Sequence, residues 1–316
     1  MQTALFSRRV RRFICAVMLL FSLGLRLWLL PAASPAETEP EVTVTEPEGI
    51  PVMVPIPAET EAPTPAQAAP QFTAADADAI VLGGNCGYTV DKQTLLQTPL
   101  PFSAADAPQV LIVHTHSSEA YTPTDAYAYE PSAAYRTLDQ SRSVIAVGDA
   151  LEAALVARDI GVVHDRSCHD YPDYNGSYAD AKQSIEALLA EHPSVVLVLD
   201  LHRDAADPPA REAVTVNGTD CARLMLVVGT DEGGLYHPFW QDNLSVALKL
   251  HVLLERNTPG LCRTMQLRKE RFNGQTSPGA FIVEVGSTGN TLEEALHSMP
   301  YLADAISELL SLTNLP

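Results

Sequence analysis

The sequence predicts an α/β domain of three layers, in which helices cover a mixed, mainly parallel central sheet. The first observation behind this prediction is a set of short apolar runs, the clearest at 110–113 and 195–201, which are typical of strands buried on both faces. The second is that longer segments with apolar residues three and four positions apart, typical of amphipathic helices, lie between such runs. Strands and helices that alternate in this way are typical of a three-layer domain.

Helices are expected where apolar residues recur on one face of a segment. They lie at 143–158, 177–191 and 240–256, and from Thr291 onward. Ser177 and Asp180 occupy the positions of a cap and its acidic partner at the start of the second helix. Thr291 and Glu294 form a capping-box pattern at the start of the last helix.

The other strands have weaker signals than the two central ones. Short strands are expected at 79–82, 161–165 and 281–285. The glycine-rich residues 83–85 are expected to form a turn. Residues 213–216 and 224–228 are predicted to pair in antiparallel fashion around Asn217-Gly218, which is a typical turn sequence.

Residues 1–31 predict a membrane anchor or an export signal. A cluster of arginines precedes an apolar run from Phe13 to Leu25, which continues beyond Arg26 to Leu30, a pattern that keeps the N-terminus in the cytoplasm and sends the following chain across the membrane. The run reaches about 18 residues, near the lower limit for spanning a bilayer, so an uncleaved single-pass anchor is favoured over a cleaved signal. The folded domain is therefore expected outside the cytoplasm.

The chain between this segment and the domain is predicted to have two parts. Residues 32–72 are rich in proline and glutamate, which predicts a disordered, extended tether, because proline blocks regular hydrogen bonding and like charges repel. Residues 73–107 are expected to be a transition segment, and residues 108–316 the folded domain.

Charge and cysteine content exclude some classes of function. The formal net charge is −19, from 20 basic against 39 acidic residues, and no basic cluster lies outside the extreme N-terminus. This balance argues against a nucleic-acid partner, since phosphate binding needs clustered basic side chains. The five cysteines are scattered singly, so neither a cysteine-based zinc site nor a disulfide framework is indicated, although one disulfide stays open.

Chemically active side chains follow or interrupt three of the predicted strands. His116 and Glu119 come after the strand at 110–113 with H-x-x-E spacing, His202 follows the strand at 195–201, and Glu284 interrupts the apolar strand at 281–285. Because the carboxyl ends of parallel strands meet at one edge of a sheet, these residues are expected to converge. Two imidazoles and a carboxylate are typical ligands of a hydrolytic zinc ion.

Glu284, Arg203 and His114, which lie in or near these strands, have more than one interpretation. Glu284 is expected to take a proton from the attacking water and return it to the leaving group, since an unpaired charge in an apolar strand is costly without a use. An ion pair of Glu284 with Arg203 is the structural alternative. His114 is either another metal ligand or, as we favour, a residue beside the metal or the substrate, on the same face as His116 if the strand continues.

A resemblance to a known family follows from these motifs taken together. They run in order from about residue 108 to 312 and comprise His114–Tyr121, His169–Tyr178, Leu199–Asp204, Gly229–Asp231, Leu235–Pro238, Val283–Gly286 and Asn290-Thr291. In this combination they resemble the stage II sporulation protein P family. The basic N-terminal segment and the proline-rich tether are also similar to the layout of that family.

The resemblance implies a zinc-dependent cell-wall hydrolase of endospore-forming bacteria that acts in forespore engulfment. The family is similar to N-acetylmuramoyl-L-alanine amidases, with an amidase-like fold. It is also described as cutting cross-links between the stem peptides of peptidoglycan. The resemblance further implies that the protein works in a membrane complex with stage II sporulation proteins D and M.

The resemblance also implies roles for individual residues. His116, Glu119 and His202 would hold zinc, and Glu284 would act as general base and acid. Glu130 competes with Glu119, because in the wider amidase family the ligand glutamate lies further from the first histidine.

The chemistry of the substrate suggests two more residues. Arg203 is expected to bind a stem-peptide carboxylate, since a guanidinium matches carboxylate geometry, and Tyr178 to line the substrate groove. Two alternatives to the amidase remain open at this point: a zinc carboxypeptidase-like wall peptidase, and a wall-binding scaffold without catalysis.

Overall fold

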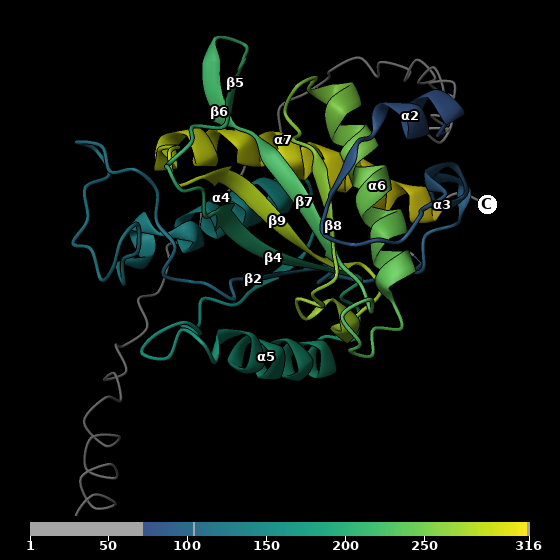
Figure 1. The fold of residues 1–316 in the computed structure, drawn as a ribbon, viewed down its shortest axis with the longest axis horizontal. Coiled ribbons are helices and arrows are strands. Elements are labelled where there is room, and N and C mark those ends of the chain that lie inside the picture. Colours follow the sequence, from purple (N-terminus) through teal and green to yellow (C-terminus); the bar gives the residue numbers. More distant parts are fainter. Residues whose placement is uncertain (1–71, 104, 315–316) are drawn as a thin grey trace, which may run out of the picture. The chain divides into compact units, whose positions relative to one another are not determined.

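The central sheet confirms the predicted α/β architecture. The computed structural model describes residues 72–103 and 105–314. Within them, seven strands form one mixed sheet (Figure 1). Their order across the sheet is β1 (Leu82–Gly84), β8 (Met265–Arg268), β7 (Leu224–Gly229), β9 (Ala280–Ser287), β4 (Leu197–Asp204), β2 (Val110–Val113) and β3 (Val162–His164).

Strand direction divides this sheet into two parallel blocks. In the first block, β9, β4, β2 and β3 are parallel, and in the second β7, β8 and β1 are parallel. The blocks meet at the antiparallel pair β7 and β9. The carboxyl ends of β2, β4 and β9 therefore lie at the same edge, as the sequence predicts.

Helices cover the two faces of the sheet unequally. One face packs against α4 (Val144–Val156), α6 (Trp240–Asn257) and α7 (Leu292–Ser311), and the other against α5 (Ser177–Glu191) (Figure 1). Short elements complete the domain: α2 (Ala74–Ala79), α3 (Lys92–Gln97), the hairpin β5 (Ala213–Val216) and β6 (Thr219–Ala222), and the 3₁₀ turns η1 (Gln140–Arg142), η2 (Gly274–Thr276) and η3 (Leu312–Asn314).

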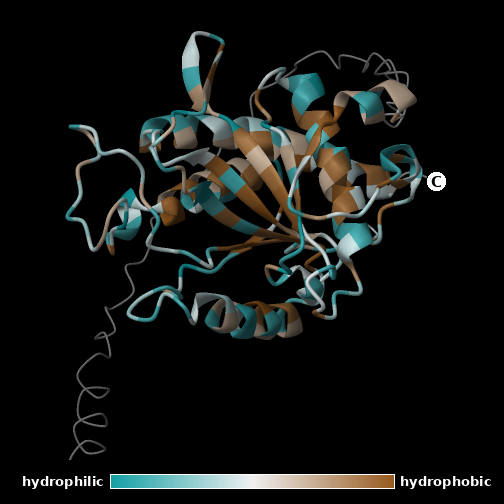
Figure 2. Cartoon of the chain, viewed as in Figure 1, coloured by the Kyte–Doolittle hydropathy of each residue, from teal (hydrophilic) through white to brown (hydrophobic). Residues whose placement is uncertain are grey.

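Alternation along the strands assigns each side chain to one face. In β4, Leu197, Leu199 and Leu201 enter the large core beneath α4, α6 and α7. Val198 enters a smaller core on the α5 face, which includes Ile185 of that helix. Figure 2 shows the strands as the most hydrophobic part of the domain. The even-numbered positions of β4, including Asp200 and His202, therefore face the α5 side.

Two of the predicted local structures are wrong. The strand expected at 79–82 begins only at Leu82, because Thr73 and Asp76 form a capping box that starts α2. Residues 213–216 pair with β6 rather than with 224–228. Asn217 and Gly218 have φ of 50° and 82°, which closes a two-residue turn and pairs the immediately following residues. Strand β7 is thereby free to join the main sheet.

Other differences concern segment ends. The cap position of α5 is Gly176, without a side-chain hydrogen bond, and Ser177 is already helical. The expected turn at 83–85 includes residues of β1, which pairs with β8, so the segment 73–107 contributes to the main sheet. Strand β8 was not predicted. The anchor predicted at 1–31 and most of the tether lie outside the described residues. Among the residues that are described, no helix is long and apolar enough to cross a membrane.

The N-terminal cap of α7 provides a stability test. Thr291 Oγ1 accepts a hydrogen bond from the Glu294 backbone at 3.3 Å, and the Glu294 carboxylate accepts one from the Thr291 backbone at 3.2 Å. Replacing Thr291 by Ala is expected to lower the free energy of unfolding by about 1 kcal/mol, because one backbone donor loses its partner. Thr291→Ser keeps the hydroxyl and should retain most of the stability. Equal denaturation midpoints for the alanine variant and the wild type would contradict this assignment.

Candidate active site

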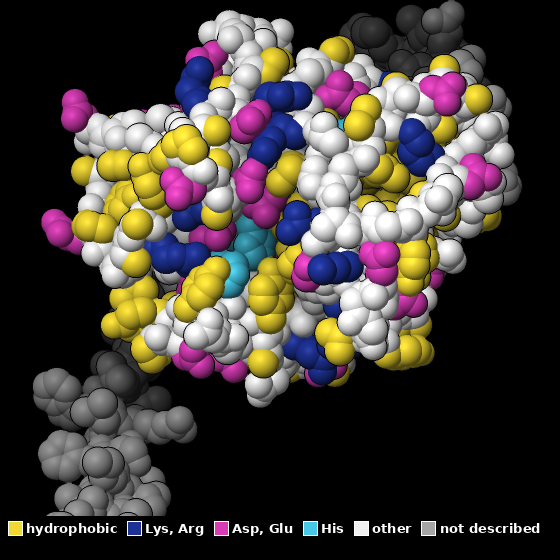
Figure 3. All heavy atoms as spheres, viewed as in Figure 1, with side chains coloured by type: hydrophobic (Ala, Val, Ile, Leu, Met, Phe, Trp, Pro, Cys, Tyr) yellow, Lys and Arg dark blue, Asp and Glu magenta, His cyan; other side chains and the backbone are white. Residues whose placement is uncertain are grey.

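A cleft of about 530 Å³ lies on the α5 face of the sheet, at the carboxyl ends of β4 and β9. Four of the predicted site residues line it together, His116, Glu119, His202 and Glu284, as do Tyr178 and Arg203. Figure 3 shows histidine side chains at the bottom of a hollow in this face of the molecule. Residues from three separate strand ends thus converge as the sequence predicts.

The three predicted metal ligands lie side by side. Glu119 Oε2 lies 3.5 Å from His202 Nδ1. The rings of His116 and His202 meet edge to face, with their centroids 5.3 Å apart. Glu130, the competing carboxylate, is exposed and does not line the cleft. The geometry therefore favours Glu119 over Glu130.

Asp200 fixes the orientation of His202. Its carboxylate oxygen Oδ1 lies 2.9 Å from His202 Nε2, and it also accepts hydrogen bonds from the backbone and hydroxyl of Thr115. Burial opposes a charge on His202, but Asp200 and Glu119 outweigh it and hold the pKa of the ring well above its usual value. From the sequence, Asp200 was assigned no part in the site. The alternation Leu-Asp-Leu-His was the available signal, since it places Asp200 and His202 on one face.

Glu284 lies next to His202 on the neighbouring strand β9, as its register partner. Its Oε2 atom is buried and has no hydrogen-bond partner. Burial raises the pKa of Glu284 to about 8, and the nearby carboxylates of Glu119 and Asp204 act in the same direction. The ion pair with Arg203 that sequence reasoning considered is not among the contacts of the described residues. The pKa of Glu284 therefore lies close to neutral pH, where a carboxyl group can both take up and give back a proton.

The donor set fits a zinc ion. Two imidazoles and one carboxylate face each other, and His116 Nδ1 and Glu284 Oε2 are buried without a hydrogen-bond partner. A carboxylate behind a ligand histidine, as Asp200 is behind His202, is the usual support of such ligands. In hydrolytic sites three protein ligands leave one position open for water.

A second cluster of carboxylates with a histidine lies outside the cleft. Within the described part of the chain, the set whose ligand atoms all lie within 4.8 Å of one another is Asp149, Glu152 and His164. Arg166 already pairs with both carboxylates there. A guanidinium thus occupies the place that a cation would take, and this cluster lies outside the cleft.

Aromatic side chains form one wall of the cleft. Tyr174 stacks on His116, with ring centroids 4.5 Å apart, and Tyr178 meets His116 edge-on at 5.5 Å. The guanidinium of Arg136 lies 4.5 Å above the Tyr174 ring and 3.7 Å from Glu119 Oε1. Tyr174 belongs to the segment 171–178 that was considered as a lining of the groove, although only Tyr178 was singled out, and Arg136 was not predicted. Both come from loops, and membership of the motif His169–Tyr178 was the one signal for Tyr174.

His114 does not share the face of His116, so that expectation is wrong. The strand ends at Val113, and His114 is fully buried on the α4 side. Its Nδ1 lies 3.1 Å from the Leu201 carbonyl and its Nε2 2.9 Å from His164 Nε2. Burial lowers its pKa to about 3. With both nitrogens engaged outside the cleft, His114 has no free atom for metal or substrate.

Arg203 reaches the cleft, but its backbone and two of its guanidinium nitrogens bind the protein, while Nη1 is buried without a hydrogen-bond partner. Its backbone donates to Glu119 Oε2 at 3.0 Å, and its guanidinium donates to the carbonyls of Ala120 and Tyr135 at 2.9 and 3.0 Å. The side chain is 3% exposed. Its observed contacts therefore hold the loop that carries Glu119.

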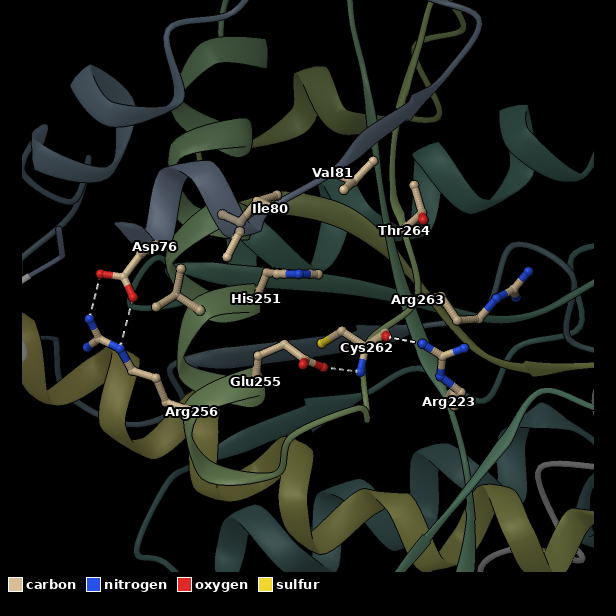
Figure 4. Close-up of a pocket in the computed structure, with 12 residues that line it drawn as sticks. Asp76, Ile80, Val81, Arg223, His251, Glu255, Arg256, Cys262, Arg263 and Thr264 are labelled. Carbon is tan, nitrogen blue, oxygen red and sulfur yellow. Dashed lines mark hydrogen bonds and ion pairs between the residues drawn. The ribbon is translucent and has the colours of Figure 1, made fainter. Parts of the chain in front are cut away.

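A second cavity, of about 410 Å³, lies between α2, α6 and the start of β8 (Figure 4). Asp76 pairs with Arg256 at 2.7 Å. Glu255 accepts a hydrogen bond from the backbone of Cys262, whose carbonyl accepts one from Arg223. These pairs join α2 and α6 to the sheet, and the cavity contains none of the predicted site residues.

The sequence model of the family described as Stage II sporulation protein P (SpoIIP) matches residues 62–307. The chain belongs to this family. Stage II sporulation protein P of Bacillus subtilis (strain 168) is 26% identical over 218 residues, which are 66% of this chain and 52% of that protein. The chain therefore spans about half the length of the curated relative that it matches.

Solved structures with some likeness are wall amidases. They include the N-acetylmuramyl-L-alanine amidase Ami1 of Mycobacterium smegmatis, with 12% identity, 67% of this chain and 99% of that chain covered, and a TM-score of 0.38. The CwlD amidase of Clostridioides difficile, in complex with the GerS lipoprotein, has 13% identity, 64% and 94% coverage, and a TM-score of 0.35. Scores this low carry no weight for the function of this chain.

The support of His202 by Asp200 predicts a change in zinc affinity. Asp200→Asn is expected to weaken zinc binding roughly 10- to 100-fold, because His202 loses the charge that orients it. The measurement is competition with a chromogenic chelator. Asp165→Asn is the matched control, since Asp165 pairs with His169 in a second aspartate and histidine pair outside the cleft. Unchanged affinity in Asp200→Asn would contradict the assignment.

Proposed function

We propose that the chain is a zinc-dependent peptidoglycan hydrolase that cleaves the amide between N-acetylmuramic acid and L-alanine of the stem peptide. The observation that carries the proposal is the meeting of His116, Glu119 and His202 with Glu284 in one cleft. Membership of the SpoIIP family supports a wall substrate. Because the family is also described as cutting stem-peptide cross-links, we propose this cleavage, at the same cleft, as a second activity.

The side chains of the cleft divide the work. A zinc ion held by His116, Glu119 and His202 would supply a Lewis acid for the amide carbonyl and lower the pKa of a bound water. Glu284 takes the proton of the attacking water and returns it to the leaving amine. A general base works best when its pKa lies near the operating pH, and burial brings that of Glu284 to about 8.

The place of action is part of the proposal. Through the family, the protein would act in forespore engulfment, outside the cytoplasm, with residues 1–31 as a membrane anchor. Its partners would be stage II sporulation proteins D and M. These assignments rest on the family and on the sequence pattern, and the tether at 32–72 would give the domain reach from the membrane.

Digestion of purified peptidoglycan by the full chain tests the activity. Glu284→Gln is expected to lower the rate by at least about 100-fold, because the amide side chain takes no proton from water, while zinc content stays unchanged. Glu119→Gln should lose zinc, whereas Glu130→Gln, altered at an exposed position outside the cleft, should match the wild type. Mass spectrometry should find intact stem peptides released from muramic acid.

The alternatives predict other products. Cuts between amino acids alone would favour a carboxypeptidase-like peptidase. If the folded wild-type protein neither binds zinc nor cleaves the wall, even with its proposed partner proteins present, the wall-binding scaffold becomes the better interpretation.

A further inference from the structure

The floor of the cleft continues from Glu284 across two further strands. In the sheet register Glu284 is opposite Met225 on β7, and Ile282 is opposite Val227, which in turn is opposite Gln266 on β8. Met225, Val227 and Ile282 form a small apolar cluster on this face, against Phe272. Because no helix covers this part of the face, the cluster is open to the cleft that it lines (Figure 1).

Arginines lie at both ends of this floor, Arg263 beside Leu224 at the Glu284 end and Arg268 opposite Gly229 at the other end. Arg263 and Arg268 line the same cleft as Glu284, and basic side chains flank the hollow that holds the histidines (Figure 3). Arg263 is already neutralised by protein carboxylates, with Asp204 at 2.8 Å and Glu212 at 3.7 Å. The side chain of Arg268 is 39% exposed against 17% for Arg263, so Arg268 is the candidate for an external anion.

Arg268 has spare binding capacity. Its single ion-pair partner among the described residues is Glu270, at 3.6 Å, and the Glu270 carboxylate also accepts two contacts of 3.1 Å from Asn85. The Nε atom of Arg268 is buried and faces Glu270, whereas the side chain as a whole is 39% exposed and its two terminal nitrogens have no hydrogen-bond partner among the described residues. The two terminal nitrogens of a guanidinium fit a carboxylate in bidentate geometry.

We infer that Arg268 binds a carboxylate of the wall peptide whose first amide is cut at Glu284. This inference rests on the proposed function and adds its substrate class: a peptide with a free carboxylate toward its carboxyl end. The whole chain carries a charge of −19, which repels an acidic peptide, so binding needs a local cation of this kind.

The sheet geometry gives the position of that carboxylate. Arg268 is two strands away from Glu284 and, by register, four residues along, which is about 10 Å across and about 13 Å along. The resulting separation of the backbones, about 16 Å, corresponds to about five residues of extended chain. Because the arginine side chain can reach back over the apolar floor, the carboxylate belongs to the third, fourth or fifth residue.

The same geometry reassigns the role expected of Arg203. A guanidinium that recognises peptide carboxylates was predicted after β4, but Arg203 is only 3% exposed, and its Nε and Nη2 donate to the carbonyls of Ala120 and Tyr135. Arg268 supplies the same chemistry from β8. Its weak, part-exposed pair with Glu270 contributes little stability, so its removal should leave the fold intact.

Binding and cleavage of soluble muropeptides test the inference. On a substrate with free carboxylates, Arg268→Ala is expected to raise KM roughly 10- to 100-fold with little change in kcat, because a charge-assisted contact is lost. Arg268→Lys should have a KM between those of the wild type and Arg268→Ala. Arg271→Ala is the matched control, since Arg271 is a neighbouring arginine that donates to the Tyr236 carbonyl outside the cleft.

Amidated substrates identify the contact. Each carboxylate of the third to fifth residues of the peptide is converted in turn to an amide. At one position the amide should weaken binding to the wild type as much as Arg268→Ala weakens binding of the unmodified peptide. Combining that amide with Arg268→Ala should cause no further loss of affinity. Binding is measured by calorimetry in the Glu284→Gln background, so it does not depend on turnover. The inference would be overturned if the losses of affinity were additive at every position, or if Arg268→Ala bound the substrate as well as the wild type. Cleavage by the wild type would still support the proposed function in that case. A wild type that cleaves nothing refutes both.

Discussion

The site depends on one constraint, the parallel alignment of β2, β4 and β9. Strand β4 lies between the other two, with Val113 opposite Asp200 and His202 opposite Glu284. A shift of one residue in this register would move the side chains of β4 to the other face, because strand side chains alternate. The large core on the α4 side opposes such a shift, since Leu197, Leu199 and Leu201 would leave it. Ordinary core packing thus fixes the chemical groups.

The groups held in this way are costly for the fold. Glu119, Asp200 and His202 are almost fully buried, and burying a charge is unfavourable unless it is paired. Asp200 is satisfied by Thr115 and His202, and Glu119 by Arg136 and the Arg203 backbone. His116 Nδ1 and Glu284 Oε2 are left without partners. Unpartnered polar atoms gathered in one cleft indicate a place where the fold gives up stability for function.

Sequence patterns predicted the elements with strong periodicity and failed where tertiary contacts decide. The apolar runs of β2 and β4 placed His202 and Glu119 at one edge, and family motifs gave the same set. His114 was placed wrongly because the strand ends at Val113, and the Asp200 contacts that hold Thr115 are not visible in the sequence. Strand β8 was missed because Met-Gln-Leu-Arg is only four residues long and half polar, and Arg268 was missed with it.

The uneven cover of the sheet explains why the cleft is where it is. Helix α5 covers the block around β2 and β4, while the face of β7 and β8 carries the small cluster of Met225, Val227 and Ile282. The loop before η2 contacts both regions, since Asn273 Nδ2 donates to the Tyr178 carbonyl at 2.7 Å while Phe272 packs on the cluster. The aromatic wall at the start of α5 and the apolar floor are thereby tied together. If the proposed peptide substrate spans both, it would meet one connected surface, which would lower the entropy cost of aligning its amide with Glu284.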